Sequence, residues 1–161
     1  MDLFETVNDC LEKYIGGEIF FDELDKAVKF DSNRLTELLA LAKKEYPNVK
    51  YIASGEIALC MHNFKIPVDI IVQGSLRKNT EPLDLSAFVT AGENYVFIDD
   101  SYFSGKTAFV IKEALAKCGC HMLGTVVIYD GCFTKKDDVK SIYRYYDYHD
   151  ILGRKLSQEP K

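Results

Sequence analysis

Short apolar runs alternate with amphipathic stretches along the middle of this chain. Runs at residues 49–53, 68–72, 95–98 and 121–129 predict strands, and the run at 95–98 is buried and too short for a helix to be preferred. Apolar residues at helical spacing predict helices at residues 35–46, at 56–64 and from 107 onward. Strands that alternate with helices imply right-handed crossovers and a mainly parallel sheet. We therefore expect an α/β fold of three layers, with helices flanking the sheet.

Length and pattern together indicate a single domain that spans residues 1–161. A chain of this length is long enough to bury a sizeable core. We expect a helical N-terminal segment at residues 1–34, the core at 35–130 and an aromatic C-terminal segment at 131–161. The N-terminal segment includes a predicted helix at residues 2–15, because its apolar residues recur every three or four positions.

One stretch combines chemical groups that suit a ligand site. The strand predicted at residues 95–98 is followed by two carboxylates, Asp99 and Asp100, and then by a small polar turn that contains Gly105. A helical pattern opens at Thr107, so the backbone N–H groups of the turn and of the helix start can hold a phosphate. Carboxylates repel a phosphate, so we expect them to face sugar hydroxyls or a metal ion. In parallel sheets such ligands bind at the carboxyl ends of the strands.

The same stretch resembles the fingerprint of the type I phosphoribosyltransferases, a hydrophobic strand, two acidic residues and a loop that ends in glycine and a hydroxyl residue. Here the fingerprint spans residues 96–107. The resemblance implies that Asp99 and Asp100 are the catalytic pair, which contacts the ribose hydroxyls of phosphoribosyl pyrophosphate (PRPP) and holds Mg²⁺ indirectly. It implies that the 5′-phosphate is bound by the residues that follow, which are Ser101, Tyr102, Phe103, Ser104, Gly105, Lys106 and Thr107.

Two further segments match places that contact pyrophosphate in the family. Ser54 and Gly55 follow the first predicted strand, and glycine lets the backbone approach an anion closely. Residues 74–94 form a long polar connection, and such connections are often functional lids. Arg77 and Lys78 near its start resemble the basic pair of the mobile catalytic loop in the orotate branch. A basic pair on a lid neutralises departing pyrophosphate, and the alternative interpretation is a solvated basic turn.

The chain also departs from the family pattern. Phe103 stands where purine enzymes carry an aspartate base, and a phenyl ring cannot accept a proton. The predicted lid lacks the lysine and the His-Gly pair of orotate enzymes, and it carries Glu81 and Asp84, whose charges oppose pyrophosphate. Two functions stay open. The chain transfers phosphoribosyl from PRPP to a nitrogenous base and releases pyrophosphate, or it is a non-catalytic module that binds PRPP or a nucleoside 5′-monophosphate for regulation or assembly.

Spacing argues against two other motifs. Gly105, Lys106 and Thr107 look like the end of a P-loop, but that pattern requires glycine at position 100, where this chain has Asp100. A zinc site is suggested by Cys118, Cys120, His121 and Cys132. Their spacing lacks the paired C-x-x-C knuckles of structural zinc sites, so the thiols are better interpreted as small buried residues.

The C-terminal segment is unusually aromatic. Its tyrosines surround Arg144 and are Tyr143, Tyr145, Tyr146 and Tyr148. They suit either a stacking surface for a planar base or a partner, or an amphipathic helix or edge strand whose tyrosines pack on the sheet. The sequence leaves these alternatives open.

Composition excludes several classes of protein. The net charge of −5 and the lack of a basic cluster argue against binding nucleic acid. No stretch has the length and apolarity to span a membrane, and the N-terminus lacks a secretory signal pattern. The five cysteines are therefore expected to be reduced thiols in a cytoplasmic protein. Members of the family are often dimers, so the resemblance implies a homodimer.

Overall fold

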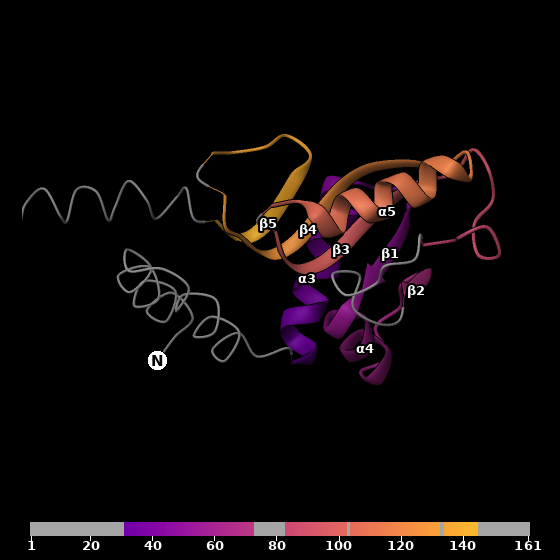
Figure 1. Ribbon diagram of the computed structural model, residues 1–161. Helices are drawn as coiled ribbons and strands as arrows, with labels where there is room; N and C mark the ends of the chain where they lie inside the picture. Colours follow the sequence, from indigo (N-terminus) through magenta and orange to yellow (C-terminus); the bar gives the residue numbers. More distant parts are fainter. Residues whose placement is uncertain (1–30, 73–82, 103, 133, 145–161) are drawn as a thin grey trace, which may run out of the picture.

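A five-stranded parallel sheet organises the structure, a computed structural model that describes residues 31–72, 83–102, 104–132 and 134–144. The strands lie in the order β2-β1-β3-β4-β5, and every neighbouring pair is parallel (Figure 1). Their bounds are β1 Lys50–Ser54, β2 Ile70–Val72, β3 Asn94–Tyr102, β4 His121–Asp130 and β5 Val139–Arg144. The predicted parallel sheet is confirmed.

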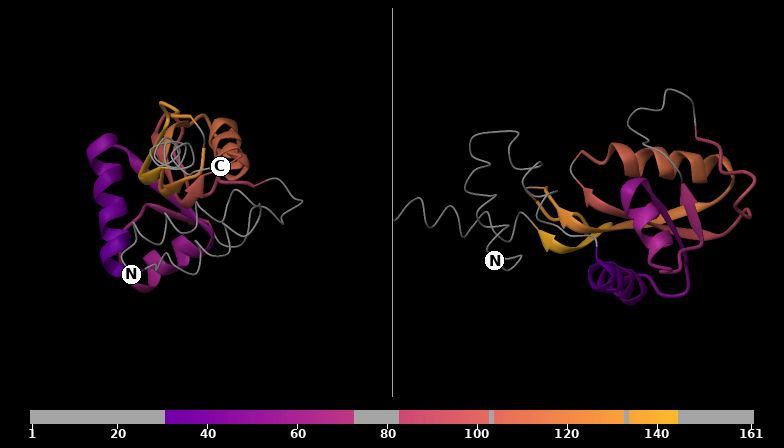
Figure 2. Two further views of the ribbon diagram at one scale, coloured as in Figure 1. Left: turned by 90° about the vertical axis from the view of Figure 1, so that its left-hand side faces the viewer. Right: turned by 90° about the horizontal axis from the view of Figure 1, so that it is seen from below.

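Helices cover both faces of this sheet and give the three predicted layers. The described helices are α3 Ser32–Glu45, α4 Gly55–Asn63 and α5 Lys106–Lys117. Helices α3 and α4 pack on one face, and α5 packs on the other (Figures 1 and 2). Side chains of β3 alternate between the two cores, so that Val96 and Ile98 pack beneath α3 and α4, whereas Tyr95 and Phe97 pack beneath α5.

The predicted helices have identifiable starts and stops. The carboxylate of Asp31, one of three cap-forming residues in a row, accepts the backbone N–H of Arg34 at 2.8 Å and caps α3. Helix α3 ends at Glu45, just before Pro47, which cannot continue a helix. Helix α4 starts at Gly55 directly after β1, so no separate turn lies between strand and helix.

Strand β3 differs from its prediction. It was expected to end at Ile98, but it continues through both carboxylates and Ser101 to Tyr102. Pairing with β4 explains the difference, because that ladder runs on to the last residue of β3. Asp and Ser have low intrinsic preference for strands, and here the long neighbouring strand overrides that preference.

The sheet also extends beyond residue 130, because β5 is its fifth strand and lies at one edge. The described part of the aromatic C-terminal segment therefore takes the edge-strand alternative as far as Arg144. The helix predicted at residues 2–15, the remaining tail and residues 73–82 of the predicted lid lie outside the described residues.

The buried Tyr95 gives the fold a testable response to alkali. Its side chain has no exposed surface, and its hydroxyl donates to Glu93 Oε2 at 2.9 Å. Burial, followed by this hydrogen bond, raises the pKa of Tyr95 above the ordinary 10.0. The folded chain therefore keeps a proton that the unfolded chain loses, so this stabilisation is full below pH 10 and declines as the pH rises further.

We predict that Tyr95→Phe makes the free energy of unfolding fall less steeply above pH 10. Each tyrosine that ionises only after unfolding adds a slope of about 1.4 kcal/mol per pH unit. Urea unfolding at a series of pH values measures this slope. Equal slopes for the wild type and the variant between pH 10 and 11 would contradict the prediction.

Candidate functional site

The carboxyl edge of the sheet is uneven beside β3, because β1 ends before β3 does, and this difference in length is called the step below. The last paired residues of β1 and β3 are Ala53 and Ile98, after which β1 has only Ser54 left. Strands β3 and β4 continue together to Tyr102 and Asp130. Beyond Ile98, the β1 side of β3 therefore no longer borders a strand, and the predicted acid pair lies at this step.

Asp99 and Asp100 are both partly exposed, but they are not equivalent. Asp99 Oδ1 accepts the backbone N–H of Asp100 at 2.8 Å, and Asp100 Oδ1 accepts the backbone N–H of Ser101 at 2.9 Å. Neighbouring residues of a strand point to opposite faces. Asp99 lines a hollow on the α5 face together with Phe97, whereas Asp100 does not line it. The structure thus brings Asp99 rather than Asp100 to the loop that begins α5.

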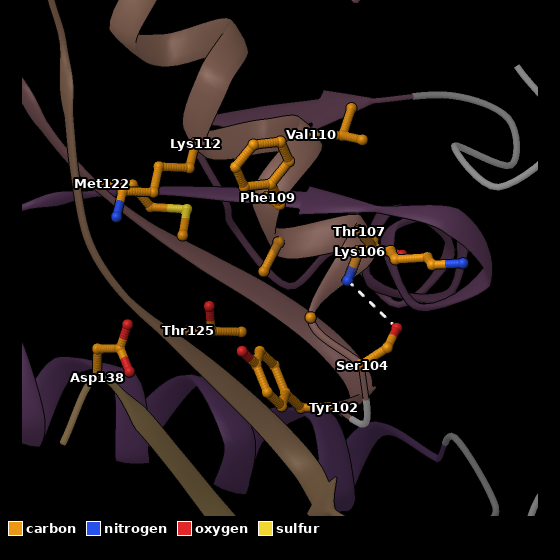
Figure 3. Close-up of a pocket in the computed structure, with 12 residues that line it drawn as sticks. Tyr102, Ser104, Lys106, Thr107, Phe109, Val110, Lys112, Met122, Thr125 and Asp138 are labelled. Carbon is orange, nitrogen blue, oxygen red and sulfur yellow. Dashed lines mark hydrogen bonds between the residues drawn. The ribbon is translucent and has the colours of Figure 1, made fainter. Parts of the chain in front are cut away.

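That loop, residues 104–107, is called the glycine loop below. Gly105 has a φ of 78°, in the left-handed region that favours glycine, and it is the N-cap of α5. Gly105 has no side chain to cap this helix start, and the backbone N–H of Lys106 donates a long hydrogen bond of 3.4 Å to Ser104 Oγ (Figure 3). Ser104 and Lys106 are exposed. The loop therefore presents an uncapped helix N-terminus, which attracts anions.

A second helix begins at the same edge. Ser54 is buried at the end of β1 and is the N-cap of α4, again without a side-chain cap. Gly55 has a φ of 70°, and no atom lies within 4 Å of the place where a Cβ would stand. The space beside the Gly55 Cα is thus open, while a role of Ser54 and Gly55 in binding pyrophosphate stays a prediction. Two helix N-termini and two carboxylates share the carboxyl edge.

The hollow beside the glycine loop is small because Tyr102 covers the loop. Asp99, Ser101 and Thr125 are among its lining residues, and its volume is about 20 Å³, on the scale of one water molecule. A Cβ placed on Gly105 would lie 2.5 Å from the Tyr102 hydroxyl oxygen, so the phenol ring packs directly on the loop. Burial raises the pKa of Tyr102, and the nearby charge of Asp138 adds to this.

A larger groove lies on the other side of the glycine loop. It has a volume of about 710 Å³. In Figure 3, Phe109 and Lys112 of α5 lie across the groove from Met122 and Thr125 of β4, and Tyr102 and Ser104 lie near one end. Asp138, just before β5, lines the remaining side. The glycine loop therefore separates a small hollow next to Asp99 from a groove along α5.

Sequence reasoning missed Asp130, a carboxylate at the carboxyl end of β4. Asp130 is fully buried, its Oδ1 accepts the backbone N–H of Cys132 at 2.9 Å, and its Oδ2 has no hydrogen-bond partner among the described residues. The same signal that selected Asp99 and Asp100, an acid after an apolar strand and before a glycine, also marks Asp130. Burial, together with the hydrogen bond to Asp130, raises the pKa of the Cys132 thiol to about 11, so Cys132 is not a thiolate at neutral pH.

Several predicted site residues lie outside the described residues, namely Arg77, Lys78 and Phe103. Within the described ranges, no three His, Cys, Asp or Glu side chains come together as a metal-binding group. Among the same residues, no helix is both long and apolar enough to span a membrane.

Comparison with known proteins identifies the fold. No protein-family model matches the chain. Curated relatives include the orotate phosphoribosyltransferases of Staphylococcus aureus strains Mu50 and N315, each 25% identical over 126 residues. The match covers 71% of this chain and 62% of each relative, so the chain spans less than two thirds of their length.

Solved structures with a similar fold come from two branches of one family. Orotate phosphoribosyltransferase from Aeropyrum pernix is 15% identical with a TM-score of 0.52, covering 89% of this chain and 82% of that one. Adenine phosphoribosyltransferase from Thermoanaerobacter pseudethanolicus is 16% identical with a TM-score of 0.51, covering 75% of this chain and 82% of that one. These structures establish the fold, and the curated relatives add similarity in sequence. The chain therefore has the fold of the type I phosphoribosyltransferases.

Proposed function

We propose that this chain binds PRPP or a nucleoside 5′-monophosphate at the carboxyl edge of its sheet, and that it transfers phosphoribosyl to a nitrogenous base with release of pyrophosphate. The observation that carries this proposal is the placement of Asp99 beside the glycine loop, in one hollow at an uncapped helix N-terminus. A ribose 5-phosphate needs an anion site and a hydroxyl site a few ångströms apart, and this edge offers both.

Each group in the proposal has one task. The backbone N–H groups of the glycine loop bind the 5′-phosphate. Asp99, with Asp100 on the opposite face of β3, accepts hydrogen bonds from ribose hydroxyls and stabilises the positive charge that develops on the sugar. The Ser54-Gly55 backbone at the start of α4 meets the pyrophosphate. Arg77 and Lys78 remain candidates for neutralising the pyrophosphate as it leaves.

The carboxylates at this edge suit a Mg²⁺ ion that arrives with the substrate phosphates, rather than one that is held entirely by protein ligands. Mg²⁺ usually keeps several waters and binds one or two carboxylates plus substrate phosphates, and the edge supplies two partly exposed carboxylates, Asp99 and Asp100. When bound with substrate, the ion neutralises charge on the phosphate oxygens. We further propose a cytoplasmic setting, which the thiols of Cys60, Cys118 and Cys120 support, since none of them forms a disulfide in the part of the chain that the structure describes.

The second candidate function is a non-catalytic module that binds the same ligands. Two observations favour it. Phe103 offers no acid or base, and the hollow beside Asp99 holds only about 20 Å³ while Tyr102 covers the loop. Binding a phosphate there requires the Tyr102 side chain to move off Gly105. The two functions share a binding step and differ only in turnover.

We predict that Asp99→Asn weakens PRPP binding more than Asp100→Asn does, because only Asp99 lines the hollow with the glycine loop. We expect losses of about 1–3 kcal/mol, the range for spoiling a charged hydrogen-bond site, with Asp99→Asn at the upper end. Isothermal titration with PRPP and Mg²⁺ measures both variants. Asp69→Asn is the matched control, since this exposed carboxylate accepts the backbone N–H of Tyr51 at 2.8 Å just before β2, away from the hollow. Unchanged affinity in both site variants would mean that the site lies elsewhere.

Gly105→Ala tests the glycine loop directly. The new methyl group meets the Tyr102 ring and sits at a φ of 78° that alanine avoids, so the loop must shift. We expect phosphate-ligand affinity to fall about tenfold or more, equivalent to about 1.4 kcal/mol. Gly92→Ala shares the positive φ, at 89°, but has nothing within 4 Å of the new methyl group. Gly92→Ala therefore controls for backbone strain. Equal effects of the two variants on affinity would contradict the claim that the glycine loop binds the phosphate.

Turnover separates the two candidate functions. We predict release of pyrophosphate from PRPP with at least one base in a panel of orotate, uracil, adenine, guanine and hypoxanthine. A coupled phosphate assay follows the release, with the Asp99→Asn variant as background. Binding of PRPP by calorimetry without release for any base would reject the transferase and favour the module.

A further inference from the structure

The large groove along α5 shares residues 104–107 with the proposed ligand site, but its remaining lining residues have no part in the proposed function. Sheets made only of parallel strands are normally covered on both faces. In the described residues, the helix contacts of β5 are mainly with α3, on the face opposite to α5. The α5 side of the β4–β5 edge instead carries the groove of about 710 Å³. Phe109 at its wall is 61% exposed.

We propose that this groove is the docking site of the chain's own C-terminal tail, residues 145–161. The tail begins where β5 ends, at Arg144. Across the sheet, Arg144 pairs with Asp130, and Asp130 pairs with Tyr102, which lies at one end of the groove. Two strand spacings of about 4.8 Å put the start of the tail about 10 Å from that end.

The tail is long enough to fill the groove. The groove extends from Tyr102 to Met122, and Met122 lies beside Tyr95 in the sheet. The length of the groove is therefore the rise of seven residues of β3, or about 23 Å. The 17 residues after Arg144 reach about 25 Å as a helix and further when extended. The chain before Asp31 enters the described fold on the opposite face, through α3. Of these two segments, the one after Arg144 therefore joins the described fold closer to the groove.

The chemistry of the tail matches the lining of the groove. Most of its apolar and aromatic residues lie soon after β5, namely Tyr145, Tyr146, Tyr148, Ile151 and Leu152, and Leu156 follows further along. The groove offers the apolar surfaces of Phe109 and Met122 to these side chains. Its wall carries charges of both signs, Lys106 and Lys112 beside Asp138, and the tail also carries both signs, with Asp147 and Asp150 ahead of Arg154 and Lys155.

Docking has a consequence for the site, because residues 104–107 line both the groove and the hollow next to Asp99. A tail in the groove packs against the back of the glycine loop and restricts its movement. The proposal itself does not depend on which ligand binds the loop, so its test uses no ligand.

Protection of the tail from chymotrypsin tests the proposal in the full-length chain. Mass spectrometry follows cleavage after Tyr145, Tyr146 and Tyr148, and a synthetic peptide of residues 141–161 gives the unprotected rate. We expect the folded chain to be cut at least about tenfold more slowly than the peptide, because cleavage requires the tail to leave the groove. Phe109→Ser should remove most of that protection. Lys112→Glu, a surface change, should speed cleavage about two- to fivefold, as expected for one exposed ion pair.

Matched controls keep the result interpretable. Phe88→Ser removes a phenyl ring that is 69% exposed and does not line the groove, and Lys65→Glu reverses an exposed charge away from it. Neither should change the cleavage rate. Tail cleavage at the peptide's rate in the wild type, or equal rates in groove and control variants, overturns the proposal. Protection that disappears on dilution also overturns it, since the tail would then occupy the groove of a second copy.

Discussion

The unequal length of neighbouring parallel strands is the constraint on which the site depends. Strand β3 is paired on both sides up to Ile98, where β1 is about to end, and beyond that point only β4 supports it. This step carries Asp99 and Asp100 past the end of β1 and leaves one side of β3 without a strand neighbour. If β1 were four residues longer, a strand would border the acid pair and α4 could not begin at Gly55.

The step also brings together groups of opposite electrostatic character. Helices α4 and α5 both begin at this edge with a glycine in the left-handed region and without a side-chain cap, so their N-termini attract anions. The carboxylates between them repel anions and accept hydroxyl or metal ligands. A sugar that carries a phosphate and free hydroxyls satisfies both requirements, which is why the geometry supports the proposed ligand better than a simple anion.

Much of this arrangement follows from the sequence, because short apolar runs and helical spacing report local structure directly. The parallel sheet, the helix before β1 and the helix after Gly105 were all predicted. The predicted end of β3 at Ile98 was wrong, because the length of this strand is set by pairing with β4, whose residues are distant in the sequence. Tyr102 packs on Gly105, and a groove runs along α5. Both features depend on three-dimensional packing, so no local sequence pattern could indicate them.

Amide chemical-shift mapping with PRPP and Mg²⁺ tests the central claim most directly, because it reports on the loop, the acid pair and the second helix start in one titration. The account predicts that the amides of residues 54–56 and 99–107 shift together and saturate at one affinity, while those at the amino edge of the sheet, such as Lys50 and Asn94, stay unchanged. Shifts confined to other parts of the sheet, or saturation of the two segments at different affinities, would contradict the claim that the step beside β3 forms a single sugar-phosphate site.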